Sequence, residues 1–172
     1  MEKIIRIRNG KIVPNLCENE VKISGKPGNV DKFIKLVGND FDFRKIISMP
    51  EEIQNTLYPV CTEGPNANMT PERQKELMAK YRGADSWYDW TLLNWTTTGL
   101  ARAVKLVVKE KNFCQFDFLT EGGPPVRIYK KTRELFPDLR ISWFYNEPVM
   151  EIRGYLDKLY AEDEKQDKEN KF

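Results

Sequence analysis

Two runs of alternating apolar and polar residues, joined by a short turn, constrain the fold most. The first run covers residues 104–109 and the second residues 114–118, with Lys111-Asn112 between them. A period of two places every second side chain on the same face of a strand. The pattern therefore predicts a β-hairpin with one apolar face, formed by Val104, Leu106, Val108, Cys114, Phe116 and Phe118.

Further strands and helices are predicted on both sides of this hairpin. Val21 and Ile23 alternate with polar residues before a turn, and Asn29 can cap a helix that ends at Gly38-Asn39. After the hairpin, Pro125 is placed to begin a second helix, and residues 141–145 alternate as a strand. The order strand, helix, strand, strand, helix, strand predicts an α+β protein with a ferredoxin-like βαββαβ antiparallel sheet.

Other segments extend this plan. Asn9-Gly10 predicts an N-terminal hairpin, residues 43–47 an extended stretch, and residues 149–159 a final helix that buries Ile152, Tyr155, Leu156 and Leu159. Residues 1–161 are expected to form a single domain. Residues 162–172 are almost all charged or amide residues, which predicts a solvated tail.

An insertion of about residues 53–95 separates the first helix from the hairpin. Residues 56–68 have the prolines, glycine and asparagines of a long loop, and Thr70-Pro71 begins a predicted helix. Four aromatic residues follow, and so much aromatic area is expected to pin the segment to the core. They are Trp87, Tyr88, Trp90 and Trp95.

Composition excludes several classes of function. The chain has 172 residues and no histidine, which removes the commonest general base and metal ligand. Three scattered cysteines fit neither a disulfide framework nor a zinc site, so we expect buried thiols and no cofactor. No apolar run approaches the ~20 residues that a membrane-spanning helix needs, and no secretory signal is apparent, so we expect a cytoplasmic protein without a membrane partner.

Several short sequence motifs, in a fixed order, resemble those of the YubB-like family. This is a group of phage- and plasmid-encoded proteins with a ferredoxin-like domain. The resemblance covers about residues 14–154 and implies the fold and a mobile-element origin, without catalytic residues. The chain departs from the family at Leu16, at residues 96–100 and at Gly122-Gly123. The matching motifs are residues 15–21, Gly25, residues 43–52, Trp87-Tyr88-Asp89-Trp90, Asn94-Trp95, Gly123-Pro124-Pro125, and residues 136–138 and 145–148.

Two sets of side chains are candidate binding residues. The aromatic segment can form a platform of the kind found at interface hot spots, or it can staple the insertion to the sheet. The basic set can contact phosphates, or it can be a solvated face that protects a strand edge. The candidates are Trp87, Tyr88, Trp90, Trp95, Lys105, Lys109, Lys111, Arg127, Lys130 and Lys131.

Two further possibilities concern the sheet and the carboxylates. Phe116, Phe118, Trp143 or Tyr145 can stack nucleic-acid bases if they lie on an open sheet face. The candidate carboxylates are Asp85 and Asp89, beside the tryptophans, and Glu121, beside Gly122-Gly123. No acidic pair has a spacing typical of a metal or catalytic site.

These observations lead to two functional hypotheses. The first is a non-enzymatic interaction protein of a phage or other mobile element that binds a host protein or ribonucleoprotein complex. Such a protein would inhibit a host defence complex in the manner of an anti-CRISPR. The alternative is a module that binds single-stranded RNA or DNA through sheet aromatics and lysines, although the net charge of +2 gives no strong field toward nucleic acid.

Overall fold

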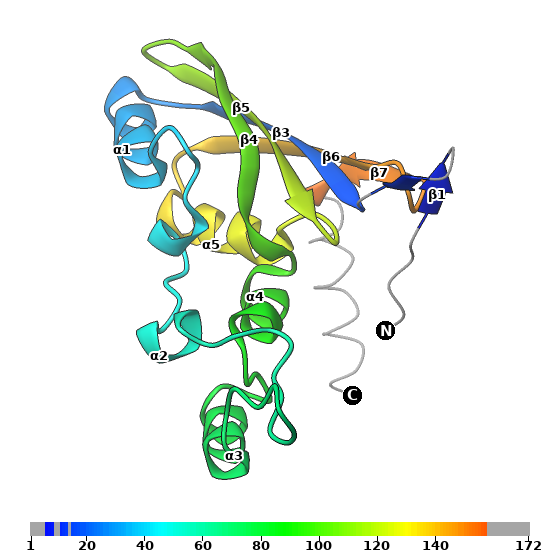
Figure 1. Cartoon of the computed structure of the whole chain (residues 1–172). Coiled ribbons are helices and arrows are strands. Elements are labelled where there is room, and N and C mark those ends of the chain that lie inside the picture. The colour runs from blue at the N-terminus through cyan, green and yellow to red at the C-terminus, as the bar shows by residue number, and fades with distance from the viewer. Residues whose placement is uncertain (1–5, 9–10, 14, 158–172) are drawn as a thin grey trace, which may run out of the picture.

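One antiparallel sheet organises the chain, and the helices lie on one side of it (Figure 1). The computed structural model describes residues 6–8, 11–13 and 15–157. The sheet has the strand order β4-β5-β3-β6-β7. Its strands are β3 (Leu16–Ser24), β4 (Thr98–Lys109), β5 (Phe113–Glu121), β6 (Arg140–Glu147) and β7 (Ile152–Tyr155).

The predicted α+β, ferredoxin-like arrangement is confirmed. The chain runs β3, α1 (Pro27–Val37), β4, β5, α5 (Val126–Leu135), β6, and the two inner strands are β3 and β5. Each of these strands is antiparallel to its neighbours, as in a split βαβ plan. Strand β7 adds a fifth position beyond β6.

Alternation along the strands decides which face of the sheet is covered. Val21 lies directly between Phe116 and Trp143 in the register of the three central strands, and all three side chains are buried. The intervening residues point to the opposite, more exposed face. The pattern of period two therefore predicted both the strands and the covered face.

The centre of the core is a phenylalanine from the loop after α1. Phe41 is fully buried and has a φ of 47°, a left-handed conformation that is uncommon for a residue other than glycine. Its ring lies 4.8 Å from that of Phe118, 5.2 Å from that of Phe116 and 5.6 Å from that of Trp143, measured between centroids. These contacts favour the otherwise unusual backbone conformation at this residue.

The segment between α1 and β4 contains more helix than the sequence pattern predicted. Residues 43–47 are not extended, because the Asp42 side chain accepts a hydrogen bond from the Arg44 amide and caps the 3₁₀ turn η1 (Phe43–Lys45). Helices α2 (Glu51–Gln54), α3 (Pro71–Lys80) and α4 (Trp87–Trp95) follow. Figure 1 shows α2 and α3 as the elements farthest below the sheet.

The predicted final helix is wrong for residues 149–155, whereas residues 156–157 are helical as predicted. Residues 152–155 form β7 instead, which pairs with β6 and supplies partners for its edge. The side chains of Ile152 and Tyr155 remain 45% and 43% exposed, whereas Leu156 is buried as predicted. Tyr155 packs on Phe144 across the strand pair, with ring centroids 5.3 Å apart. Leu159 and the predicted tail at 162–172 lie outside the described residues.

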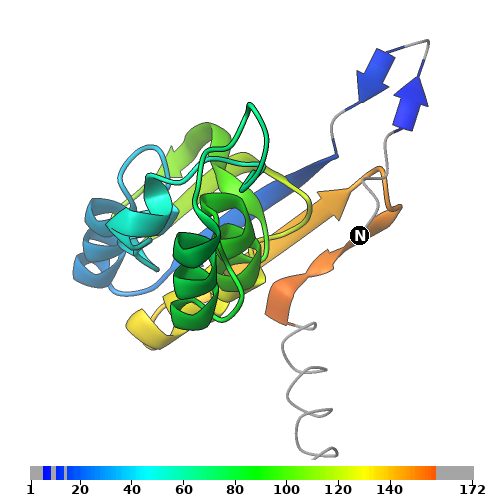
Figure 2. The same ribbon diagram turned by 60° about the horizontal axis from the view of Figure 1, so that its bottom comes forward.

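Strands β1 (Arg6–Arg8) and β2 (Lys11–Val13) form the predicted N-terminal antiparallel pair. They are a separate two-stranded sheet, at the opposite end of the molecule from α2 and α3 (Figures 1 and 2). Within the ranges that the structure describes, no helix has both the length and the apolar character needed to cross a membrane.

Candidate functional site

Two tryptophans of α4 (Trp87–Trp95), Trp90 and Trp95, are buried and join the insertion to the core. Trp95 is 1% exposed, and its indole nitrogen donates a 3.1 Å hydrogen bond to the backbone carbonyl of Ile47. Its ring meets the rings of Phe43 and Trp90 edge-on, at centroid distances of 5.7 and 5.6 Å. Trp90 is also buried. These two tryptophans therefore anchor the insertion, as one reading of the sequence predicted.

The N-terminal end of the same helix lies at the surface. The ring of Tyr88 stacks on Tyr58, with centroids 4.0 Å apart and an interplanar angle of 15°. Trp87 meets both rings edge-on, at 5.8 Å from Tyr88 and 6.4 Å from Tyr58. We call Tyr58, Trp87 and Tyr88 the aromatic cluster. Tyr58 is 44% exposed and the adjacent Leu57 is 61% exposed, so this apolar surface faces solvent.

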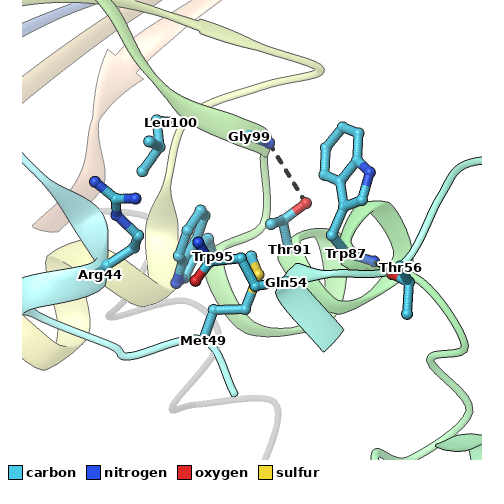
Figure 3. A pocket seen from close by; sticks show the side chains of 9 residues that line it. All are labelled: Arg44, Met49, Gln54, Thr56, Trp87, Thr91, Trp95, Gly99 and Leu100. Atoms are coloured by element: carbon cyan, nitrogen blue, oxygen red, sulfur yellow. Dashed lines mark hydrogen bonds between the residues drawn. The ribbon is translucent and has the colours of Figure 1, made fainter. Parts of the chain in front are cut away.

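A pocket of about 340 Å³ opens beside the aromatic cluster (Figure 3). Trp87, Thr91 and Trp95 line it from one face of α4, because a spacing of four residues brings side chains to the same side of a helix. Gly99 has a φ of 77°, a backbone conformation suited to glycine, at the start of β4. We call this the α4 pocket, and its other lining residues are Arg44, Met49, Gln54, Thr56, Gly99 and Leu100.

The two hydroxyl groups in the α4 pocket already have partners. The Thr56 hydroxyl donates to the carbonyl of Ile53 at 2.6 Å and accepts from the amide of Trp87 at 2.8 Å. The Thr91 hydroxyl donates to the carbonyl of Tyr88 at 2.8 Å and accepts from the amide of Gly99 at 3.4 Å, the contact drawn in Figure 3. The walls available to a ligand are therefore mainly apolar.

The charged residue of the α4 pocket is also paired. Arg44 donates two hydrogen bonds of 2.9 Å to the Asp42 carboxylate. Burial alone would raise the pKa of Asp42, but hydrogen bonds from the Arg44 side chain and amide, with the charges of Arg44 and Lys45, lower it below its ordinary value. The carboxylate is thus ionised at neutral pH and balances the guanidinium.

The predicted basic residues lie on two elements other than α4. Lys105 and Lys109 are exposed on β4 and Lys111 on the turn after it, and Lys105 is opposite Asp117 in the strand register. On α5, Arg127 is exposed, while Lys130 and Lys131 are half-buried and Lys131 pairs with Glu134 at 2.8 Å. None of these side chains lines the α4 pocket.

The sheet aromatics do not lie on the open face. Phe116, Phe118, Trp143 and Tyr145 are all buried under the helices, so the expectation that they can stack bases there is wrong. They occupy the apolar positions of the alternating strands, and these positions form the core beneath the helices. The open face has carboxylates at its centre, where Glu20 lies directly opposite Asp117.

The candidate carboxylates have structural roles. Asp89 accepts a hydrogen bond from the Ser86 hydroxyl, and the Ser86 oxygen accepts from the Asp89 amide at 3.3 Å, which caps the start of α4. Burial raises the pKa of Asp89, and the neighbouring Asp85 raises it further. Asp85 accepts from Gln74 at 2.7 Å, and Glu121 pairs with Arg102. Among residues 15–157, no three Cys, Asp or Glu side chains are grouped to hold a metal ion.

The thiols are also largely inaccessible. Cys17 and Cys114 are fully buried, as predicted, whereas Cys61 is half-buried. Burial is the largest cause that raises the pKa of Cys17 to about 12 and that of Cys114 to about 11. Both groups are therefore protonated at neutral pH and unreactive as nucleophiles.

Sequence reasoning missed the contribution of the loop to this site. Tyr58 and Leu57 were read only as part of a long loop, and the structure is what shows that both side chains are exposed together. Met49 and Leu100 had no signal of their own, since they line the same pocket as Trp87 only in the folded chain.

Comparisons with known proteins support the fold. No family model matches the chain, and no curated protein matches it. A solved structure that does match is that of the protein api92 from Yersinia pseudotuberculosis, described under the family model DUF1281. The TM-score is 0.53 at 13% sequence identity, and the match covers 83% of this chain and 93% of that chain. At this identity, the similarity extends to the fold alone.

Proposed function

We propose that this chain is a non-enzymatic protein-interaction module, and that the aromatic cluster with Leu57 is its binding surface. The observation that supports this most is the exposure of Leu57 and Tyr58 beside two further half-buried rings. Tyrosine and tryptophan are enriched at interface hot spots, because they combine a large apolar area with a polar group.

The aromatic cluster is also held in place before any partner arrives. Tyr58 and Tyr88 stack on each other, and the hydroxyl of Thr56 binds the first amide of α4 at Trp87. The C-terminal end of the helix is anchored by Trp95. A rigid surface has less conformational entropy to lose on binding, which favours affinity.

The nature of the partner is proposed from the resemblance to the YubB-like family. That resemblance supports a mobile-element origin, and hence a host protein or ribonucleoprotein complex as the target. Inhibition of a host defence complex requires only that the protein cover a surface of its target. A rigid apolar surface suits that task, and no catalytic group is needed for it.

Binding of single-stranded nucleic acid is less well supported. The four sheet aromatics that were predicted to stack bases are buried, and the centre of the open sheet face has Glu20 and Asp117. Glu20 pairs with Lys22 at 2.8 Å and Asp117 lies opposite Lys105, so these positions offer phosphate groups no excess of positive charge. The exposed lysines of β4 are partly balanced, since Lys105 faces Asp117 and Arg102 pairs with Glu121.

A capture experiment with matched variants tests the proposal. The purified protein is immobilised, incubated with host lysate, and compared with the double variant Leu57→Ser, Tyr58→Ser. We expect the native protein to retain a specific partner and the variant to retain at least about tenfold less, as for the loss of a hot spot. The matched control is Leu135→Ser on α5, where the leucine is 45% exposed. No retained protein, or equal retention by the double variant, would refute the proposed surface.

A further inference from the structure

The α4 pocket adjoins the aromatic cluster and shares Trp87 with it. Its walls include the indoles of Trp87 and Trp95, the thioether of Met49 and the side chain of Leu100 (Figure 3). The volume of about 340 Å³ is at the lower end for small-molecule sites and is sufficient for a large amino-acid side chain.

We propose that the α4 pocket receives one uncharged apolar side chain from the protein partner. This inference rests on the proposed function, because the pocket then forms a recess within the same binding surface. The side chain acts as an anchor, and the aromatic cluster excludes water around it. Anchors that fill such pockets dominate the energy of many protein interfaces.

The charges at the pocket indicate that the anchor is uncharged. The guanidinium of Arg44 is already bonded to Asp42, and nearby Asp40 and Lys45 add one charge of each sign. A charged side chain that entered the pocket would lose its hydration without gaining a free counter-ion. A nucleotide is disfavoured for the same reason, because its phosphate would find no unpaired cation among the lining residues.

The surroundings of the pocket suit a peptide backbone on either side of the anchor. Leu100 belongs to β4, an edge strand that in residues 15–157 pairs only with β5. The free edge of β4 and the exposed side-chain amide of Gln54 offer hydrogen-bond donors and acceptors to the peptide groups of a partner. Bulges interrupt the pairing of β4, so a long added strand is disfavoured and a single anchor remains the main contact.

Titrations with small probes, followed by NMR, test the ligand class without the partner. The probes are N-acetyl-leucinamide and N-acetyl-phenylalaninamide, and the comparison compounds are N-acetyl-glutamic acid amide and adenosine monophosphate. The signals observed are the indole N–H groups of Trp87 and Trp143, of which the second is buried in the core as an internal reference. We expect the apolar amides to shift the Trp87 signal at millimolar concentration and to leave Trp143 unchanged.

Two variants complete the experiment. Leu100→Gln should weaken binding of the apolar amides about tenfold, since an apolar wall of the pocket is lost, whereas Leu135→Gln on α5 should not. Equal or tighter binding of the glutamic acid amide or the nucleotide would overturn the inference, as would the absence of any shift at Trp87. In that event, continued capture of a partner that depends on Leu57 and Tyr58 would leave the proposed function standing.

Discussion

The two ends of α4 contain the same kinds of residue but lie in different environments. Trp90, near the middle of the helix, and Trp95, at its C-terminal end, are buried, and the Trp95 indole has a carbonyl partner in the interior. At the N-terminal end, Tyr88 stacks on the loop residue Tyr58 and Trp87 meets it edge-on, and Tyr58 is itself 44% exposed. The comparison shows that the neighbouring segments, and not the aromatic residues themselves, decide which of these rings belong to the core and which lie at the surface.

The aromatic rings of α4 differ in the contacts that stabilise them. A buried indole needs a partner for its N–H group, and the Ile47 carbonyl supplies one to Trp95. The same ring meets Phe43, which connects the insertion to the core. At the other end, Trp87 packs against the border of the core, and Tyr58 leaves part of the cluster's apolar area exposed to solvent.

The largest expected effect is at the buried end. Replacement Trp95→Ala should lower the free energy of unfolding by about 3–5 kcal/mol, because it opens a cavity next to Phe43 and leaves the Ile47 carbonyl without its donor. Urea denaturation followed by circular dichroism measures the change. Trp87→Ala is the matched variant and should lower the free energy of unfolding clearly less. Equal losses for the two variants would contradict the division of α4 into core and surface.

A smaller effect is expected at the hydroxyl that fixes the exposed end. Thr56→Val removes the acceptor for the Trp87 amide and the donor to the Ile53 carbonyl, which should cost about 1–2 kcal/mol in unfolding free energy. The control is Thr62→Val, a half-buried site in the same loop, which should stay within ~0.5 kcal/mol. If the two valine variants unfold at the same urea concentration, the hydroxyl does not hold the start of α4.

The sheet could be predicted from the sequence because period two is a local signal. Residues 104–118 and the strands around Val21 and Trp143 alternate strongly, and the structure pairs these strands in one sheet. β7 was predicted as part of a helix, since Ile152, Tyr155 and Leu156 also fit helical spacing. The pairing partner on β6 decided between the two structures, and that partner is distant in sequence.

The candidate site could be predicted only in part. Trp87 and Tyr88 were recognisable as candidate interface residues by type. The pocket was not predictable, because Met49, Gln54 and Leu100 come from three separate segments that meet α4 only in the folded chain. Phe41 is a similar case, since its place at the centre of the core depends on a left-handed backbone conformation with no clear signal in the sequence.

The most direct test of the account is the solvent accessibility of the four tryptophans, Trp87, Trp90, Trp95 and Trp143. The protein is labelled with 5-fluorotryptophan, and the ¹⁹F signals are compared in H₂O and D₂O, with one Trp→Phe variant for each assignment. We expect a clear solvent isotope shift for Trp87 and little or none for the three buried rings. A shift of Trp95 as large as that of Trp87, or a fully protected Trp87, would contradict the account.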